Sequence, residues 1–299
     1  MRIVLKGYLQ LMRPANLPTA AADILAGITI VLYLQNIDVM TFLGEQGGDV
    51  FLLVFSSVAL YAGGVVFNDV FDAELDAVER PERAIPSGRV PKRKAIYFGT
   101  VLMLIGIALA FKCTLLSGMI SVVLTIAILA YDGYFKQFGF VGPLNMGICR
   151  GLNLLLGMSI LGSLTHWYIS LVPVVYIFAI TLISRGEVHG NNKKHIVWAG
   201  ILYAIVVLSI ALIVMQQKDN VLVLLPFLLL FGFLIYSPLI KAYKENSPKN
   251  IKKAVMGGVL SLVVMNACWV AGFSNWYLAL AVLLLLPISM LLSKLFAVT

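Results

Sequence analysis

Ten runs of mainly apolar residues occupy most of this chain, and polar segments separate them. A run of about 18 or more apolar residues is long enough to cross the hydrocarbon core of a bilayer as a helix. The runs cover residues 15–35, 50–68, 94–112, 115–132, 142–162, 166–184, 195–215, 221–240, 252–271 and 276–296. Because backbone polar groups in lipid must be paired within the chain, each run is expected to be helical. The pattern therefore predicts an all-α, polytopic membrane helix bundle, with residues 1–299 as a single domain.

The composition agrees with this class. The chain is 61% hydrophobic and only 12% charged, and its mean hydropathy is +0.96. These values exclude an ordinary soluble domain. The longest polar interval is 69–93, and the other intervals are too short for a separate soluble domain. Two glycine pairs inside the runs, Gly63-Gly64 and Gly257-Gly258, are expected to let neighbouring helices approach closely.

The basic residues orient the predicted bundle. If the N-terminus lies inside and the runs alternate in direction, all of the 22 Lys and Arg residues except Lys112 and Lys218 fall on the inner side. The positive-inside rule then predicts a multi-pass protein of the cell inner membrane, with residues 68–76 on the cytoplasmic side. The net charge of +8 becomes a topology signal. We expect no nucleic-acid partner, because the basic residues are spread over several loops and both termini.

An acidic cluster follows the second apolar run, where residues 68–76 read NDVFDAELD. On a helix, at about 100° per residue, Asn68, Asp72 and Asp76 lie within about 80° of one another, with Asp69 beside them. Charges near lipid are costly unless they have a function. Clustered hard oxygen ligands suit Mg²⁺, which completes its shell with substrate phosphates. The cluster predicts a membrane enzyme that holds a diphosphate through magnesium; a hydrated acidic loop is the alternative.

Basic residues near the cluster are candidates for contacting that diphosphate. Arg80 and Arg83 lie in the next segment, in which Pro and Gly predict a turn-rich loop. Lys136 follows shortly after the fourth run, close to Tyr131. The alternative for Lys136 is an anchor at the lipid headgroups.

Polar residues also lie inside the fifth run, namely Asn145, Arg150 and Asn153. An arginine that deep in the membrane is expensive unless it faces a cavity or a partner. A phosphate group is one candidate partner, and an acidic motif is the other. His189 could act as an acid or base near neutral pH, although a plain polar loop residue is an equal alternative.

These motifs resemble a known family. The pattern Asn-Asp-x-x-Asp-x-x-x-Asp at 68–76, followed by Arg-Pro-x-Arg-x-Ile-Pro-Ser-Gly-Arg at 80–89, resembles the first aspartate-rich signature of the UbiA family of intramembrane prenyltransferases. Arg13-Pro14 and the stretch from Tyr131 to Lys136 are also similar to the family. The resemblance implies a bundle of typically nine helices around a central cavity. It also implies Mg²⁺-dependent transfer of a polyprenyl group from its diphosphate to a small acceptor, usually aromatic, within the lipid bilayer, with Lys136 contacting the diphosphate.

The second signature of the family departs from its pattern here. The family has Asp-x-x-x-Asp after the sixth span, whereas this chain has Glu187 and Asn191 at those positions. The spacing still places both side chains on one face, but Asn191 brings no charge, and Lys193 could supply positive charge nearby. Residues 184–191 resemble the UbiA-like branch called EboC. That resemblance implies secondary-metabolite biosynthesis in bacteria and an acceptor such as a cyclitol-type alcohol.

Two other classes of function fit part of the pattern. A transporter or lipid flippase would carry charges along a path through the membrane, whereas here the charges gather at one mouth and Arg150 is the deep one. A non-catalytic prenyl-lipid binding protein with a UbiA-like fold is the other alternative. The candidate catalytic residues are Asp72, Asp76, Lys136 and Arg150. The candidate substrate-binding residues are Asn68, Arg80, Arg83, Tyr131, Asn145, Asn153, Lys193 and His189. The candidate metal ligands are Asn68, Asp69, Asp72, Asp76, Glu187 and Asn191.

Overall fold

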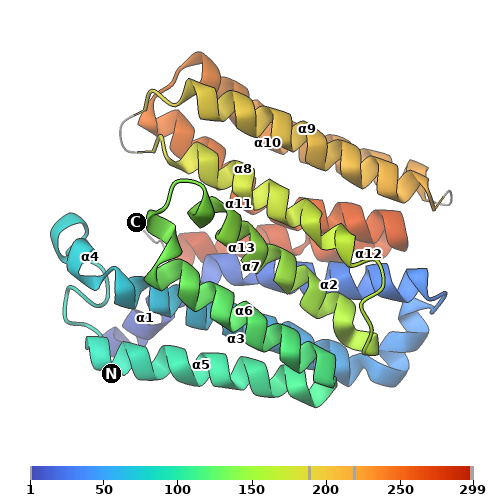
Figure 1. Cartoon of the computed structure of the whole chain (residues 1–299), viewed down its shortest axis with the longest axis horizontal. Coiled ribbons are helices and arrows are strands. Elements are labelled where there is room, and N and C mark those ends of the chain that lie inside the picture. The colour runs from blue at the N-terminus through green and yellow to red at the C-terminus, as the bar shows by residue number, and fades with distance from the viewer. Residues whose placement is uncertain (1, 188–189, 218–219, 297–299) are drawn as a thin grey trace.

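The computed structural model describes residues 2–187, 190–217 and 220–296, with side chains from residue 5 onward. The described residues form helices and connecting turns, without any strand. Ten of the helical segments are long and apolar enough to cross a membrane, which confirms the predicted all-α bundle at ten spans (Figure 1). The α-helices are α1 (Arg2–Leu11), α2 (Leu17–Leu34), α3 (Val39–Phe71), α4 (Ala73–Glu79), α5 (Lys92–Cys113), α6 (Leu115–Gly133), α7 (Val141–Met158), α8 (Leu171–Ser184), α9 (Lys193–Met215), α10 (Val221–Lys244), α11 (Pro248–Phe273), α12 (Trp276–Leu283) and α13 (Leu285–Leu295).

Short 3₁₀ segments extend or connect these helices. They are η1 (Pro14–Asn16), η2 (Phe135–Gln137), η3 (Ser159–Leu161) and η4 (Trp167–Ser170). The second span is longer than predicted, because α3 begins at Val39, where Asp38 caps it by accepting a hydrogen bond from the Thr41 N–H at 2.8 Å. Its 33 residues would span about 50 Å, more than a hydrocarbon core of about 30 Å. The non-helical backbone of Gln46 marks the bend between its polar start and its apolar span.

The central helix of the bundle is α2. Its residues Ala22, Ala26 and Ile30 pack into one hydrophobic core with α8–α12. Its residues Ile24 and Ile28 pack into a second core with α3, α5, α6 and α7. Because α2 carries apolar residues around its whole circumference, with Asp23 as its one charged residue, it can be buried on all sides, and it joins the two halves of the bundle (Figure 1). Exposed apolar side chains on α5, α9 and α10 face outward, as expected for a surface solvated by lipid.

Two glycines let α2 and α7 cross at backbone contact. A Cβ atom at Gly27 would lie 2.5 Å from the Leu154 carbonyl oxygen, and one at Gly157 would lie 2.5 Å from the Ile24 carbonyl oxygen. Such close approach of small residues is a common way to pack helices in membranes. It brings the polar residues one or two turns away on the two helices against each other.

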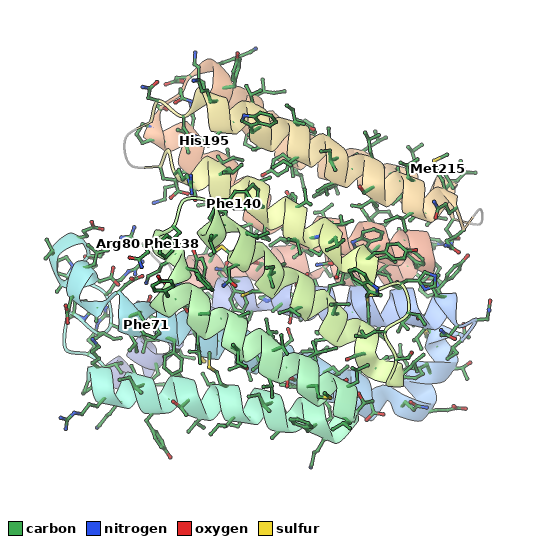
Figure 2. All side chains as sticks on the ribbon, in the orientation of Figure 1. Phe71, Arg80, Phe138, Phe140, His195 and Met215 are labelled. Atoms are coloured by element: carbon green, nitrogen blue, oxygen red, sulfur yellow. The ribbon has the colours of Figure 1, made fainter. Side chains whose placement is uncertain are left out.

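One end of the bundle gathers the segments that carry the predicted site. Figure 2 places Phe71, Arg80, Phe138, Phe140 and His195 at this end, and Met215 at the opposite end. The end of α3, the α6–α7 connection and the start of α9 therefore lie at the same end of the bundle. The chain is a multi-pass membrane protein with its polar connections concentrated there.

Candidate functional site

The acidic cluster stays on one face although the helix changes at Asp72. Asp72 closes α3 and precedes α4, with φ −85° and ψ 1°. The Asp72 N–H donates to the Asn68 carbonyl at 3.0 Å, and the Asp76 N–H donates to the Asp72 carbonyl at 2.8 Å. Because this i to i+4 pattern continues through the junction, Asn68, Asp72 and Asp76 keep the shared orientation that their spacing predicts. We call the group formed by Asn68, Asp69, Asp72, Asp76 and Asp132 the acidic mouth.

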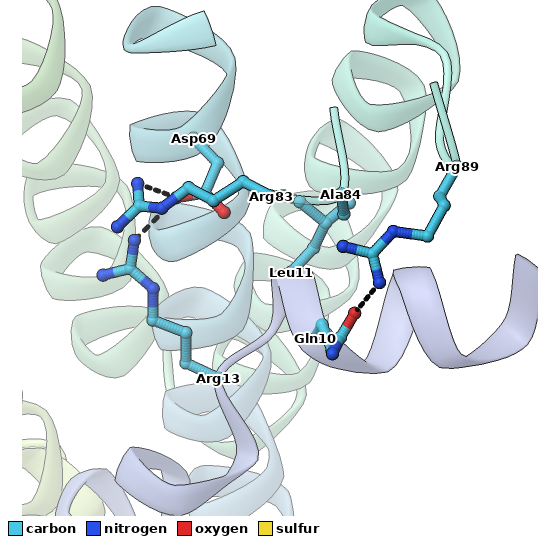
Figure 3. Close-up of a pocket in the computed structure, with 7 residues that line it drawn as sticks. All are labelled: Gln10, Leu11, Arg13, Asp69, Arg83, Ala84 and Arg89. Atoms are coloured by element: carbon cyan, nitrogen blue, oxygen red, sulfur yellow. Dashed lines mark hydrogen bonds and ion pairs between the residues drawn. The ribbon is translucent and has the colours of Figure 1, made fainter. Parts of the chain in front are cut away.

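Two arginines pair with Asp69 and Asp76, which are two of the buried aspartates of the acidic mouth. Arg13 Nη2 lies 2.6 Å from Asp69 Oδ1 (Figure 3). Arg83 Nη1 lies 3.4 Å from the same Asp69 oxygen and 2.7 Å from Asp76 Oδ2. Asp69 and Asp76 are only 8% and 4% exposed. Carboxylates this well shielded would be costly without these cations. A small cavity of about 40 Å³ lies beside Arg13, Asp69 and Arg83.

A third cation and an amide complete the acidic mouth. Lys136 pairs with Asp72. Asn68 Nδ2 donates to Asp132 Oδ1 at 2.9 Å, and Asn68 Oδ1 accepts from Arg13 Nη2 at 3.4 Å. Asp132 is 4% exposed and was not among the predicted site residues. Its signal in the sequence was a charge at the end of an apolar run, which is the same signal that marked Lys136.

Local backbone structure brings Arg13 and Arg83 to these partners. Arg13 separates α1 from η1 in the left-handed region, with φ 46° and ψ 67°, a conformation that costs a non-glycine residue about 1 kcal/mol. Arg83 lies in the turn-rich segment that the sequence predicts. Ala84 and Val90 from this segment are buried against Leu11, and they pack with residues of α3 and α5. The segment therefore folds back over the end of α3.

A cavity of about 370 Å³ extends behind the acidic mouth into the bundle. It brings together the predicted residues Asn68, Tyr131, Arg150 and Asn153. Most of its wall is apolar or aromatic. Its lining is formed by Arg13, Thr19, Ser57, Tyr61, Gly64, Val65, Asn68, Leu124, Ile128, Tyr131, Asp132, Met146, Cys149, Arg150, Asn153, Ile177, Val259 and Leu262.

The partner of Arg150 is Asp23 on α2. Arg150 Nε lies 2.6 Å from Asp23 Oδ2, and Asp23 is fully buried. Asn153 and Asn266 also donate to Asp23, at 2.9 and 2.7 Å. The sequence interpretation that Arg150 is the deep charge was therefore wrong, because Asp23 lies equally deep. Asp23 is recognisable in the sequence as a lone aspartate after three alanines in the first apolar run. A lone carboxylate is costly in lipid unless it is paired.

Several predicted residues lie outside the acidic mouth and the cavity. Asn145 donates to the Ala127 carbonyl at 2.8 Å and so joins α7 to α6. Arg80 is exposed. The Lys193 ammonium lies 5.6 Å from the centre of the Tyr243 ring. His189 falls outside the described residues.

The two second-motif residues differ in their surroundings. Glu187 is half-buried, and burial raises the pKa of its carboxyl, while the positive charges of Lys252 and Arg80 act to lower it. Asn191 is exposed and has φ 54°. Its neighbour Asn192 is buried, donates to the Leu182 and Ile183 carbonyls at 3.2 and 3.0 Å, and so caps α8.

The carboxylates of the acidic mouth fit a magnesium ion by the type of their donor atoms. Mg²⁺ prefers carboxylate and amide oxygens, and it keeps open positions for phosphate oxygens. Within the part of the chain that the structure describes, no group of three or more His, Cys, Asp and Glu is arranged around a metal position. Asp69, Asp72 and Asp76 face cations instead. Binding of a metal by these oxygens would require those cations to turn to another anion.

Comparison with known families identifies the family of this domain. Residues 39–186 match the UbiA prenyltransferase family, which confirms the resemblance seen in the motifs. The chain carries a UbiA prenyltransferase family domain. The matched range of this UbiA chain runs from α3 to α8, so it contains the aspartate motif and much of the cavity lining.

Curated relatives of this UbiA chain include two archaeal proteins named digeranylgeranylglyceryl phosphate synthase. The one from Saccharolobus solfataricus is 32% identical over 182 residues, which are 60% of this chain and 61% of that protein. The one from Methanococcoides burtonii is 35% identical over 165 residues, which are 53% of this chain and 56% of that protein. The UbiA chain therefore spans about three fifths of the length of the relatives that it matches.

Solved structures share the fold of this UbiA chain. A structure described as digeranylgeranylglyceryl phosphate synthase in membranes superposes with a TM-score of 0.66 at 21% identity, covering 91% of this chain and 99% of that chain. A UbiA homologue from Archaeoglobus fulgidus, described as bound to DMAPP and Mg²⁺, superposes with a TM-score of 0.63 at 16% identity, covering 88% and 98%. At these identities the likeness concerns the fold.

Proposed function

We propose that this UbiA chain is a Mg²⁺-dependent prenyltransferase that moves a prenyl group from its diphosphate to a small acceptor within the membrane. The observation that carries the proposal is the acidic mouth at the open end of an apolar cavity, with Arg13, Arg83 and Lys136 beside its carboxylates. Asn68 and Asp132 of the acidic mouth, together with Arg13, also line the cavity, so oxygen ligands for a metal and cations for a diphosphate adjoin an apolar wall for an isoprenoid. The names of the relatives and the ligands of the Archaeoglobus fulgidus homologue support the same chemistry.

Each part of the acidic mouth has a role in this chemistry. Magnesium, held by Asp69, Asp72 and Asp76 with the Asn68 oxygen, would neutralise the charge that grows on the leaving diphosphate. Glu187 and Asn191 are candidates for a second ion. Lys136, Arg13 and Arg83 turn from the aspartates to the diphosphate oxygens, as charge-assisted hydrogen bonds favour.

The transfer step breaks the allylic C1–O bond, and its electron pair leaves with the diphosphate. An electron pair of the acceptor then forms the new bond to C1, and the acceptor proton passes to the released diphosphate. The apolar cavity wall keeps water from the allylic cation until the acceptor attacks. The rings of Tyr61 and Tyr131 line the same cavity and stabilise the cation by cation–π attraction.

The proposal also includes the side of the membrane and the kind of product. The basic segments at the end of the bundle that carries the site support an inner-membrane protein with a cytoplasmic active site. The acceptor class stays open at this point. The names of the relatives point to a glyceryl phosphate, whereas the resemblance of residues 184–191 to the EboC branch points to a cyclitol-type alcohol of secondary metabolism.

The test is turnover of the purified protein in lipid nanodiscs with geranylgeranyl diphosphate. Diphosphate release is measured with and without Mg²⁺, and mass spectrometry of membranes fed labelled isoprenoid precursor detects a new prenylated species. Asp76→Asn and Asp72→Asn keep the side-chain shape and remove the charge. We expect each to lower Mg²⁺-dependent release by about 100-fold or more, the usual cost of losing an electrostatic group of an active site.

Glu74→Gln is the matched control, because Glu74 is an exposed acidic residue of the same short helix, and it should retain turnover. Full turnover of both aspartate variants would refute the metal role. Binding of the diphosphate without release, for every acceptor, would identify a non-catalytic prenyl-lipid binding protein instead.

A further inference from the structure

The end of the cavity opposite the acidic mouth is polar. Ser57 and Asn68 both line the cavity and are eleven residues apart on α3. At 1.5 Å per residue, these two positions are about 16 Å apart along the helix axis. Thr19, Ser57, Arg150 and Asn153 line this inner end, and we call these four residues the cavity floor. An apolar prenyl chain is a poor ligand for the cavity floor, since it would leave buried polar groups unpaired.

Hydrogen bonds within the protein fix the cavity floor. Asn153 uses its whole amide, accepting from Ser57 at 2.7 Å and donating to Asp23 and to the Ala20 carbonyl at 2.9 and 3.1 Å. Arg150 faces Asp23 through Nε and donates to the Thr19 carbonyl through Nη2 at 2.6 Å. The crossing of α2 and α7 at Gly27 and Gly157 sets the positions of both elements. The cavity floor is therefore preorganised.

Two kinds of hydrogen-bonding group remain for a ligand. Among the described residues, Arg150 Nη1 has no hydrogen-bond partner, although a guanidinium carries five donors. The hydroxyl of Ser57 donates its hydrogen to Asn153, and the hydroxyl of Thr19 donates to the Asn16 carbonyl at 2.7 Å. Both hydroxyl oxygens therefore keep lone pairs that can accept. The cavity floor offers donors and acceptors side by side.

The charge of the cavity floor is balanced. Asp23 lies 2.6 Å from Arg150 and has 0% exposure, so water does not screen it. An anionic group that approached the guanidinium would also meet the field of this carboxylate, and it would lose its own hydration. A neutral hydroxyl group meets neither cost. It can accept from Arg150 and donate to Ser57 or Thr19.

We propose that the cavity floor binds the acceptor of the transfer reaction and that this acceptor is a neutral, hydroxyl-rich molecule. The inference rests on the proposed function and adds the substrate class. A diphosphate at the acidic mouth places C1 part of the way down the cavity, and a compact acceptor anchored on the cavity floor fills the remainder. Asp23 is a positioning residue that orients Arg150 and balances its positive charge.

The first test compares acceptor probes that differ in charge on the same skeleton. One pair is myo-inositol and myo-inositol 1-phosphate, and the other is 4-hydroxybenzyl alcohol and 4-hydroxybenzoate. Each is given with geranylgeranyl diphosphate and Mg²⁺ in nanodiscs, and kcat/KM for the prenylated product is measured by mass spectrometry. We expect the neutral member of each pair to be preferred by about tenfold or more, the usual cost of one uncompensated buried charge interaction. Preference for the anions would overturn the inference.

The second test changes the charge behind Arg150. Asp23→Asn keeps the shape of the side chain and leaves the guanidinium unbalanced, so the ratio of kcat/KM for the neutral and the anionic probe should shift by about tenfold or more toward the anion. A merely structural role would lower both values together and leave the ratio unchanged, which would overturn the inference. Thr29→Val is the control, because Thr29 is a buried polar residue of the same helix that donates to the Leu25 carbonyl.

A third measurement does not depend on turnover. Cys149 lines the cavity, so a bound probe should slow its alkylation by iodoacetamide, which peptide mass spectrometry reads separately from Cys113 and Cys268. We expect myo-inositol to protect Cys149 more than its phosphate does, and the order to reverse in Asp23→Asn. Equal reactivity with and without myo-inositol would overturn the inference. Absence of diphosphate release with any acceptor, by contrast, would refute the proposed function itself.

Discussion

Substituting Lys136 by methionine should change the affinities for metal and for diphosphate in opposite directions. Lys136 pairs with Asp72, so its ammonium group occupies a carboxylate that is a proposed metal ligand. The same ammonium group lies beside the proposed diphosphate site. The Lys136 and Asp72 side chains are 27% and 23% exposed, which reduces the value of this pair through solvent screening. The net effect on each ligand can still be estimated.

Two contributions favour the metal in Lys136→Met. The pair itself stabilises the metal-free state by about 0.5–1 kcal/mol at this exposure, and a cation a few ångströms from a divalent ion adds a similar or larger repulsion. Metal binding without diphosphate should therefore tighten by about 1–2 kcal/mol, or about 5- to 30-fold. The diphosphate loses a charge-assisted hydrogen bond, so its metal-free affinity should fall by about 10- to 150-fold.

The assay uses Mn²⁺, whose free form gives an electron paramagnetic resonance signal, and a non-reactive thiodiphosphate analogue followed by calorimetry. Both titrations are done on protein in nanodiscs. Lys253→Met is the control, since Lys253 is an exposed lysine on α11, and both affinities should stay within about twofold. A decrease of both affinities in Lys136→Met, or no change in either, would refute the charge exchange.

Two further predictions concern stability. Gly157→Ala should lower the unfolding temperature in detergent by several degrees, because its Cβ would lie 2.5 Å from the Ile24 carbonyl oxygen. Gly232→Ala is the control and should leave the unfolding temperature unchanged, because Gly232 has open space around it. Equal unfolding temperatures of the two variants would contradict the close crossing of α2 and α7. Glu187→Gln should raise the unfolding temperature more at pH 7 than at pH 4. The reason is that burial raises the pKa of Glu187 above its ordinary value of 4.5, so the folded state loses stability as the pH rises through that range. A gain that is equal at both pH values would show that Glu187 does not titrate in this way.

The local part of the site could be predicted from the sequence. The spacing of Asn68, Asp72 and Asp76 depends on helix geometry alone, and the hydrogen bonds through the α3–α4 junction preserve it. The same holds for the glycine pairs, since a Cβ at Gly63 would lie 2.8 Å from Met103 Cγ and one at Gly258 would lie 2.9 Å from Ile180 Cγ1. Both features are set by residues that are neighbours in the chain or by the absence of a side chain.

The partners across the bundle could not be predicted in the same way. Arg13 reaches Asp69 over 56 residues, and Lys136 reaches Asp72 over 64, so both pairs depend on how the helices pack. Asn145 shows the same limit, because a polar residue in an apolar run can serve a neighbouring helix instead of a cavity. Asp23 could have been found as a lone charge in lipid, but its pairing with Arg150 requires the crossing of α2 and α7.

The crossing of α2 and α7 has a consequence for how this lineage can diverge. Because the two backbones touch at Gly27 and Gly157, a substitution on either helix at this crossing directly changes its contacts with the other helix. Asp23 and Arg150 should therefore covary: a descendant that gives up the guanidinium should also give up the carboxylate, while both glycines persist. Acceptor choice would then evolve through paired replacements at two sites on a constant scaffold.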